Sequence, residues 1–515
     1  MSARLVVIAL DSFDKDLLLA WAGSGELPAL GGLLQRATWG IAEAPLAVYA
    51  GAVWPSFNTG TFPSRHRRFF RRQSPRGEYL DAAFTPHDVV GVPFWEILSA
   101  AGRRVAVLDV PHCSVAKSLN GIQLVDWGSH EPELGQALTY PAGWRDEVIE
   151  RFGIEPPDFC EQTPHTVEGY QTLDRHLKAR LDRRIALTRH YLQSDDWDLL
   201  IVTIGEAHCA GHQWWHLHDP TDPQYDAGIA AQCGDLLKQT YVAVDQGVGE
   251  IVSAAGSDAH VVVVGTHGIG PLCNASVVLD EILRRLEPSS TGQAPSLFSR
   301  LKQYWYTLPN GIRSSSPARW LKERLRPSLH QSLLVPERHR RQFFAIPHNP
   351  HAGAVRINLR GREAHGVVQP EEYRKVCDNL RNELLRLTCP ETGADVVEDV
   401  YKTKDIYDGP FVDELPDLLV EWKRDRPVTS IESPRIGTLT IPTTARRSGD
   451  HKRDGFYVVI GPGHGAGRVE RHVPIVDFAP TFCAILGTTT PPMDGVVIPE
   501  LLPRPRTDRS PQLEV

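Results

Sequence analysis

Two histidines four residues apart follow an apolar run in the middle of the chain. His208 and His212 come directly after residues 199–204, whose apolar and β-branched side chains are typical of a buried strand. Residues four apart lie about 40° apart around a helix axis, so both imidazoles can face one metal ion. The pair predicts a metal site, although a chance pair of surface or core histidines fits the same spacing. His216 and His218 follow, either as substitute ligands or as neighbours only.

Other residues that bind metals lie at the ends of other apolar runs. Asp11 follows residues 5–10, His267 follows the run that ends at Gly265, and His451 precedes residues 456–460. Because ligands gather beyond the carboxyl ends of parallel strands, we expect these side chains to converge. Two of them also have a structural reading, as a helix N-cap for Asp11 and as a turn residue for His267.

The elements that position these residues alternate between strands and helices. This alternation predicts an α/β fold with a mostly parallel sheet covered by helices on both faces. The expected strands are residues 5–10, 104–109, 121–127, 199–204, 260–265, 354–359, 417–422 and 456–460. Helical periodicity is clearest at residues 173–192, 230–254 and 370–387.

Composition limits the classes of protein to which the chain can belong. Its 515 residues carry a formal charge of −8, with 41% hydrophobic and 23% charged residues. This balance disfavours disorder and a nucleic-acid-binding surface, which needs a basic surplus. No apolar run reaches the roughly 20 residues of a membrane-spanning helix, and the N-terminus lacks the features of a signal peptide. We therefore expect a cytoplasmic protein with no membrane or nucleic-acid partner; its oligomeric state is not predicted.

The pattern changes between residues 287 and 349, where serine and proline become frequent and basic helical fragments appear. We interpret 287–349 as an inserted cap or lid, with a solvated surface excursion as the alternative. The α/β core then comprises residues 1–286 and 350–502, and a polar tail at 503–515 is expected to be disordered.

Several motifs occur in the order found in one known family. Residues 6–11 with 25–30 (GELPAL), 54–66 (WPSFNTGTFPSRH), 356–363 (RINLRGRE), 415–418 (LPDL) and 477–495 carry them. Together they resemble the alkaline phosphatase superfamily, specifically its type I phosphodiesterase/nucleotide pyrophosphatase branch. The resemblance implies an alkaline-phosphatase-like three-layer sandwich with an inserted cap. It also implies two divalent metal ions, usually zinc, and a Ser or Thr nucleophile at the start of a helix.

Carrying the family's ligands over gives two unequal metal sites. One site is implied to hold His208, His212 and His451, with histidine at the first position where the family has aspartate. Three nitrogen donors suit a catalytic zinc with an open position. The other site is implied to hold Asp11 and His267, next to Thr266 where the family has a second carboxylate.

The nucleophile position is the main departure from the family. Nine residues before Thr59 the chain has Ala50, which cannot form a phosphoryl-enzyme intermediate. The family can place an arginine near the phosphate after this segment. Arg71 or Arg72 is a candidate for that role, because guanidinium binds phosphate in a bidentate manner. A solvated basic loop is the alternative for both arginines.

These observations predict a metal-dependent hydrolase of small phosphate esters. Zinc is the expected ion, as one or two ions, with Mn²⁺ as the alternative. Water made acidic by the metal is expected to attack directly, in place of the missing side-chain nucleophile. The competing hypothesis is a non-hydrolytic family member, either a ligand-binding pseudoenzyme or a biosynthetic group-transfer enzyme, because Ala50 and Thr266 remove two expected ligands.

Overall fold

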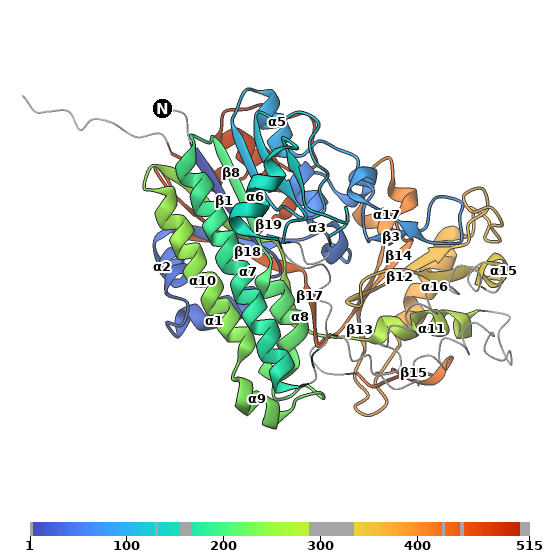
Figure 1. Cartoon of the computed structure of the whole chain (residues 1–515). Helices are drawn as coiled ribbons and strands as arrows, with labels where there is room; N and C mark the ends of the chain where they lie inside the picture. Colours follow the sequence, from blue (N-terminus) through green and yellow to red (C-terminus); the bar gives the residue numbers. More distant parts are fainter. Residues whose placement is uncertain are drawn as a thin grey trace, which may run out of the picture.

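A nine-stranded sheet forms the centre of the molecule (Figure 1). The computed structural model describes residues 4–128, 132–154, 164, 166–287, 334–424, 428–442 and 447–504. In spatial order the strands are β19 (Gly467–Pro474), β2 (Thr38–Glu43), β18 (Asp454–Ile460), β9 (Ala259–Gly265), β1 (Arg4–Leu10), β8 (Leu199–Ile204), β5 (Val105–Leu108), β6 (Gly121–Val125) and β7 (Leu138–Tyr140). The strands from β9 to β6 are parallel, whereas β18 and β7 run antiparallel to their neighbours.

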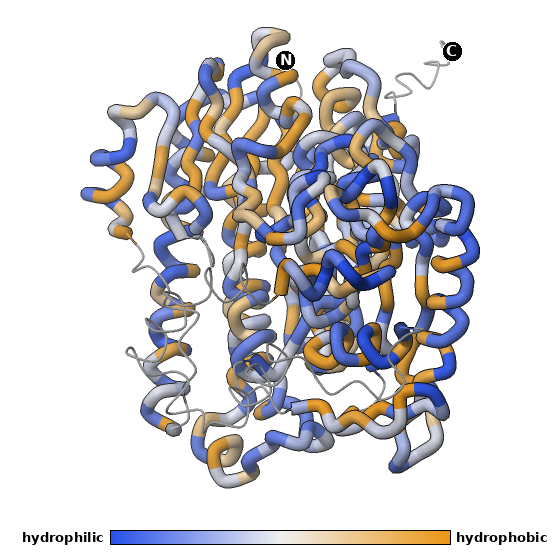
Figure 2. The backbone as a smooth tube through the Cα atoms, turned by 90° about the vertical axis from the view of Figure 1, so that its right-hand side faces the viewer, coloured by the Kyte–Doolittle hydropathy of each residue, from blue (hydrophilic) through white to orange (hydrophobic). Residues whose placement is uncertain are grey.

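Both faces of this sheet are covered by helices. In β1, alternate side chains enter two separate cores: Val6 and Ile8 pack on one face, Leu5 and Val7 on the other. The first face is covered by α1 (Lys15–Gly23), α2 (Pro28–Arg36), α6 (Trp144–Phe152), α7 (Val167–Ser194), α8 (Glu206–His218) and α10 (Leu236–Ala255). The second is covered by α3 (Tyr49–Thr59), α5 (Phe94–Ala100) and α18 (Phe478–Ile485). Figure 2 shows hydrophobic colour along the strands. The predicted three-layer α/β sandwich is confirmed.

A smaller antiparallel sheet lies beside the main one. Its order is β11 (Phe343–Ile346), β12 (Ala352–Ile357), β14 (Leu418–Trp422) and β13 (Val397–Lys402). The helices α11 (Leu279–Leu286) and α16 (Tyr373–Leu384) pack on it. The strands expected at 354–359 and 417–422 therefore belong to this second sheet. A buried apolar run indicates a strand but does not indicate its partner.

The predicted inserted segment is described only in part. Residues 334–349 contribute α15 (Val335–Arg340) and β11, so this part of the segment joins the second sheet. Residues 288–333 lie outside the described residues, as do 505–515 of the predicted tail. An inserted cap at 287–349 and a tail at 503–515 stay predictions.

One predicted helix is divided in two. Residues 230–254 span α9 (Ala227–Cys233) and α10, which are separated at Gly234 and Asp235. Gly234 has a φ of 70°, in the left-handed region, and the Asp235 side chain accepts a hydrogen bond from the Lys238 N–H. A left-handed glycine followed by a capping aspartate ends one helix and starts the next, which apolar periodicity alone does not show.

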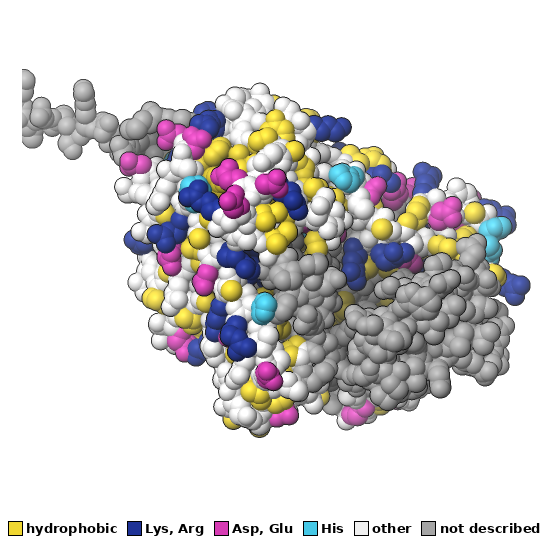
Figure 3. All heavy atoms as spheres, in the orientation of Figure 1, with side chains coloured by type: hydrophobic (Ala, Val, Ile, Leu, Met, Phe, Trp, Pro, Cys, Tyr) yellow, Lys and Arg dark blue, Asp and Glu magenta, His cyan; other side chains and the backbone are white. Residues whose placement is uncertain are grey.

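Acidic and basic side chains are interspersed on the face shown in Figure 3. Among the described helices, none is by itself long and apolar enough to cross a membrane. Only α1 and α2 pass that length and composition test together, and they are bent by 93° relative to each other.

Candidate active site

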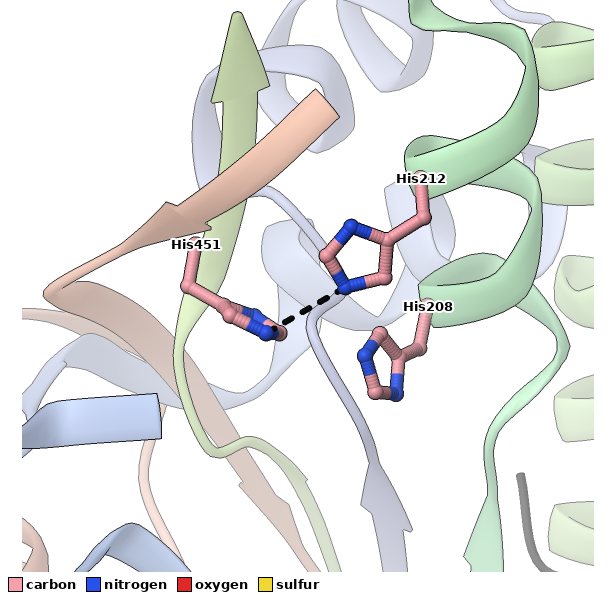
Figure 4. Close-up of side chains that lie close together, drawn as sticks. All are labelled: His208, His212 and His451. Carbon is pink, nitrogen blue, oxygen red and sulfur yellow. Dashed lines mark hydrogen bonds between the residues drawn. The ribbon is translucent and has the colours of Figure 1, made fainter. Parts of the chain in front are cut away.

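Three of the predicted ligands converge beyond the carboxyl end of β8. His208 and His212 lie one turn apart on α8, and His451 lies on β17 (Gly449–Lys452). One ring nitrogen from each lies within 4.8 Å of the others, and the Nε2 atoms of His212 and His451 are 3.3 Å apart. Figure 4 shows the three rings gathered between the helix and the strand. The structure therefore places these three imidazoles around one point.

The close approach of β17 to α8 depends on a glycine. A Cβ atom at Gly449 would lie 2.2 Å from the Gly211 carbonyl oxygen, so no larger residue fits there. The Gly449 carbonyl oxygen lies 2.7 Å from His212 Nδ1, which donates to it. This hydrogen bond fixes the tautomer of His212 and leaves Nε2 to face His451.

Asp11 and His267 join the same cluster from neighbouring strands. Asp11, directly after β1, has its Oδ2 atom 2.8 Å from His208 Nδ1 and accepts a hydrogen bond from Trp54 Nε1 at 3.2 Å. His267, two residues after β9, has its Nε2 atom 3.0 Å from His451 Nδ1. All five residues predicted as metal ligands thus lie in one continuous cluster.

Burial sets the charge state of the cluster. It lowers the pKa of His267 to about 4 and that of His451 well below the ordinary value. Burial alone would raise the pKa of Asp11, but the charge of His208 and its hydrogen bond hold that pKa well below its usual range. Neutral imidazoles at His267 and His451 and an ionised carboxylate at Asp11 are the forms that bind metal ions, so these donors fit a divalent cation.

The sequence analysis missed Ser12. Its Oγ atom lies 2.9 Å from His267 Nε2 and 3.1 Å from His451 Nδ1, in a fully buried position. The backbone of Ser12 has a φ of 51°, in the left-handed region that non-glycine residues rarely adopt. Thr266, where the family has a carboxylate, instead makes a 3.0 Å hydrogen bond with His267 Nδ1. Both hydroxyls orient the imidazoles.

Ala50 lies in the first turn of α3, at the position expected to carry the nucleophile. It is the one residue of α3 that is partly exposed; every other residue of the helix is buried. No side chain caps this end of α3. The first turn therefore presents a methyl group and uncapped backbone to accessible space.

The arginines predicted to bind substrate lie on a separate hairpin. Arg72 in β3 (Arg72–Gln73) pairs with the Asp81 carboxylate and donates to the Asp81 carbonyl at 2.7 Å. The exposed Arg71 precedes it, and its carbonyl accepts from the Phe84 N–H at 2.9 Å. These contacts lie within the hairpin, and a substrate-binding role for Arg71 or Arg72 stays a prediction.

The remaining histidines of α8 have other partners. His216 Nδ1 lies 2.8 Å from Ser448 Oγ, and His218 Nδ1 lies 2.8 Å from an Asp235 carboxylate oxygen. Of the two residues, neither joins the group formed by His208, His212 and His451. They are neighbours of the cluster rather than substitute ligands.

Comparison with known proteins agrees with this architecture. Solved structures similar to the chain include phosphonoacetate hydrolase from Sinorhizobium meliloti 1021 in complex with phosphonoacetate, at 13% identity and a TM-score of 0.53. That alignment covers 95% of this chain and 96% of the other. Murine ectonucleotide pyrophosphatase/phosphodiesterase 5 is 11% identical over 96% of this chain and 97% of its own, with a TM-score of 0.49. An inactive form of the murine protein is in complex with AMP.

The similarity to phosphonoacetate hydrolase supports the fold, and the family assignment comes from the sequence. The chain matches none of the curated protein sequences compared with it. The family model for type I phosphodiesterase/nucleotide pyrophosphatase matches residues 5–452, which is most of the chain. This match confirms the resemblance found in the motifs. The chain therefore belongs to the type I phosphodiesterase/nucleotide pyrophosphatase family, a family of phosphoester hydrolases.

Proposed function

We propose that this phosphoester hydrolase is metal-dependent and that His208, His212 and His451 hold its catalytic cation. The observation that supports the proposal is the placement of three donor nitrogens within 4.8 Å of one another. Three nitrogen ligands with an open fourth position are typical of catalytic zinc. Zn²⁺ is the expected ion, and Mn²⁺ is the alternative.

The neighbouring side chains fit a supporting role. In this proposal Asp11 and His267 bind a second, weaker cation or orient the substrate. Asp11 also holds the His208 ring through the 2.8 Å contact described above. When bound, a divalent cation supplies charge that stabilises phosphoryl oxygens and lowers the pKa of water.

Water is the proposed attacking group because residue 50 is alanine. The start of a helix carries a partial positive charge, and its first N–H groups bind phosphate oxygens. The first turn of α3 is therefore proposed to bind the phosphoryl group without forming a covalent bond to residue 50. Small phosphate monoesters or diesters are the proposed substrates.

Replacing one ligand tests this proposal. We expect His212→Ala to lower zinc content and to reduce kcat/KM by more than about 100-fold, since loss of a ligand's outer partners alone costs about 10- to 100-fold. Turnover of p-nitrophenyl phosphate and bis-p-nitrophenyl phosphate is measured on zinc- and manganese-loaded protein. His218→Ala is the matched control, because His218 lies on the same helix and contacts Asp235 instead.

Two results would contradict the proposal. Full activity of His212→Ala, or of metal-stripped wild-type protein, would exclude the metal dependence. Metal-loaded wild-type protein that binds phosphate esters without turnover would favour the non-hydrolytic alternative, which Ala50 motivates.

A further inference from the structure

A histidine outside the cluster follows β5 at the same edge of the central sheet. β5 is parallel to β8, so the loop after β5 begins beside the strand end that leads into α8. His112 lies in this loop with a φ of 55°, and Asp109 and Asp126, which follow β5 and β6, have φ values of 57° and 54°. Non-glycine residues rarely adopt this left-handed conformation, and such backbone strain is concentrated at functional sites. The loops after β5 and β6 therefore deserve a role in the chemistry of this edge.

Hydrogen bonds tie these two loops together. Asp109 accepts a hydrogen bond from the Gly128 N–H at 2.9 Å, which joins the loop after β5 to the loop after β6. The Asp126 side chain accepts from the Leu134 N–H at 2.8 Å. The residue before Leu134 is Glu133, so these bonds fix the segment that carries the Glu133 carboxylate.

Glu133 and Arg68 hold the ring of His112. The Nδ1 atom of His112 lies 3.1 Å from Glu133 Oε2 and 3.1 Å from Arg68 Nη2. Arg68 is almost completely buried and pairs with both carboxylate oxygens of Glu133. Burial alone would raise the pKa of Glu133, but His112 and Arg68 hold that pKa well below its usual range, so Glu133 is ionised. A carboxylate beside Nδ1 orients an imidazole and stabilises its protonated form.

The same arginine connects His112 to the first turn of α3. Arg68 Nε donates to the Gly51 carbonyl oxygen at 3.3 Å. A Cβ atom at Gly51 would lie 1.9 Å from the Phe69 carbonyl oxygen, so the segment that carries Arg68 packs directly on this turn. Both contacts of the His112 ring use Nδ1, which leaves Nε2, on the opposite side of the ring, for a further partner. The side chain of His112 is 19% exposed, so the ring borders accessible space.

His112 also lies close enough to the cluster to act on its charges. Burial opposes the low pKa of Asp11, and His208, His267 and then His112 lower it. Burial dominates the low pKa of His267, to which His112 makes a smaller contribution. The charged and titratable groups that act on His112 are Glu133, Arg68, Asp126, Asp11 and His267. His112 therefore lies near Asp11 and the start of α3, beside the proposed position of the phosphoryl group.

We infer that His112 is a catalytic acid whose Nε2–H donates a proton to the leaving oxygen of the phosphate ester, and that Glu133 is the residue that positions its ring. The inference rests on the proposed function, which places the phosphoryl group between the histidine cluster and the start of α3. In this step the oxygen of water bonds to phosphorus, the bond from phosphorus to the leaving oxygen breaks, and the proton of His112 moves to the leaving oxygen. The attacking water loses a proton to the solvent, from which His112 is protonated again.

A proton donor at this position specifies the kind of leaving group. An alkoxide is a strong base and leaves slowly unless it is protonated, whereas a leaving phosphate needs no proton. The inference therefore names the substrate class as phosphate esters of ordinary alcohols rather than pyrophosphates.

Esters that differ in the basicity of the leaving group test the inference. Phenyl phosphate and diphenyl phosphate release phenolate, a stronger base than the nitrophenolate released by p-nitrophenyl phosphate and bis-p-nitrophenyl phosphate. General acid catalysis contributes about 10²- to 10⁴-fold where the leaving group needs a proton. We expect His112→Gln to lower kcat/KM by at least about 100-fold for the phenyl ester and by less than about tenfold for the nitrophenyl ester. Zinc-loaded protein is assayed with the pair, monoester or diester, that the wild type hydrolyses.

The pH profile separates proton donation from structural support. For the phenyl ester, kcat/KM of the wild type should fall at alkaline pH as His112 loses its proton. This alkaline limb should be absent in His112→Gln, whereas a purely structural change would lower the rate without changing the profile.

Two further variants serve as rescue and control. His112→Gly is compatible with the fold, because glycine readily adopts a φ of 55°, and added imidazole should restore part of its turnover of the phenyl ester. Lys117→Gln is the matched control, since Lys117 is exposed on the same segment and should change neither rate. Zinc content should be equal in all variants.

Two outcomes would overturn the role of His112 alone. One is an equal loss for the phenyl and nitrophenyl esters in His112→Gln, which would make His112 a structural or phosphoryl-binding residue. The other is a rate for the phenyl ester that His112→Gln leaves unchanged. Failure of zinc-loaded wild-type protein to hydrolyse any of the four esters would instead overturn the proposed function and this inference together.

Discussion

At the scale of single residues, hydroxyl groups hold the imidazoles that the site requires. Ser12 contacts His267 and His451, and Thr266 contacts the other nitrogen of His267. These contacts fix ring orientation and tautomer as outer partners of metal ligands do. The loss of a carboxylate at Thr266 therefore removes a potential ligand and leaves the His267 ring supported.

Residue 50 allows a direct test of whether the site can still support attack by a side-chain nucleophile. Ala50 is partly exposed at the start of α3, so a threonine side chain has room there. We predict that Ala50→Thr forms a phosphorylated enzyme when it is mixed with substrate and zinc, because the hydroxyl stands where the family has its nucleophile. Intact-protein mass spectrometry measures the added phosphoryl group.

The matched control is Ala50→Val, which has the same shape as the threonine variant and lacks the hydroxyl. It should show no adduct and a similar melting temperature. A folded, zinc-loaded Ala50→Thr protein that never becomes phosphorylated would mean that position 50 is not aligned with the phosphoryl group.

Residue types and positions after predicted strands singled out Asp11, His208, His212 and His267 as candidate ligands, the family resemblance added His451 to their set, and the structure gathers all five. Nothing in the sequence indicates that Ser12 and Arg424 belong to the site. A serine beside an aspartate fits any turn, and Arg424 reaches the cluster only because β14 and β17 are brought together from separate sheets. Their proximity is a property of the tertiary fold.

At the scale of elements, the position of α8 is fixed by buried charges at its first turn. Glu206, the first residue of α8, accepts from Arg180 Nε of α7 at 2.7 Å, and both side chains are almost completely buried. Arg184, also on α7, lies with its Nε atom 3.7 Å from Glu206 Oε1 and donates to Asp109 at 2.7 Å. These pairs hold the start of α8, and therefore His208 and His212, against α7.

This buried network predicts a large effect on stability. We expect Glu206→Gln to lower the free energy of unfolding by about 3–5 kcal/mol, because it leaves a buried arginine without its charge partner. Urea denaturation measures the change. Glu250→Gln is the control, since Glu250 pairs with Arg189 at 2.7 Å in an exposed position, and such pairs contribute about 0–1 kcal/mol. Equal losses in both variants would contradict the role given to Glu206.

The elements themselves were predictable to different degrees. The strand β8 is expected at 199–204 and observed at Leu199–Ile204. It is predictable because a strand that is covered on both faces needs a continuous run of apolar residues. By contrast, β2 and β19 were not predicted. β19 is largely exposed and has a weak apolar pattern. Pairing at the sheet edge, rather than local sequence, makes it a strand.

At the scale of the whole molecule, the site is shared between two sheets. The central sheet provides Asp11 and His267 at strand ends, whereas Arg424, which follows β14 of the second sheet, donates to the carbonyl oxygen of His451. The geometry of the cluster therefore depends on how the two sheets pack against each other.

The whole fold also buries histidines in a neutral form, which predicts acid sensitivity. Burial lowers the pKa of His66 to about 3 and that of His348 to about 4. The unfolded chain has histidines with pKa near about 6.5, so it binds more protons than the native state below that pH. The contribution of these two histidines to the free energy of unfolding is therefore complete above about pH 6.5. It is lost as the pH falls toward their pKa values in the folded protein.

When the pH is lowered from about 7.5 to about 5, each of these histidines should lower the free energy of unfolding by about 2 kcal/mol. The pair should therefore lower it by about 4 kcal/mol in metal-stripped protein. Urea denaturation at the two pH values measures the loss. His66→Gln should remove about half of it, because His66 contacts Ser56 Oγ at 2.9 Å and accepts from the Arg68 N–H at 3.2 Å only as a neutral ring. Stability that stays constant across this range would show that the unfolded and native states bind the same number of protons, contrary to the burial of these rings.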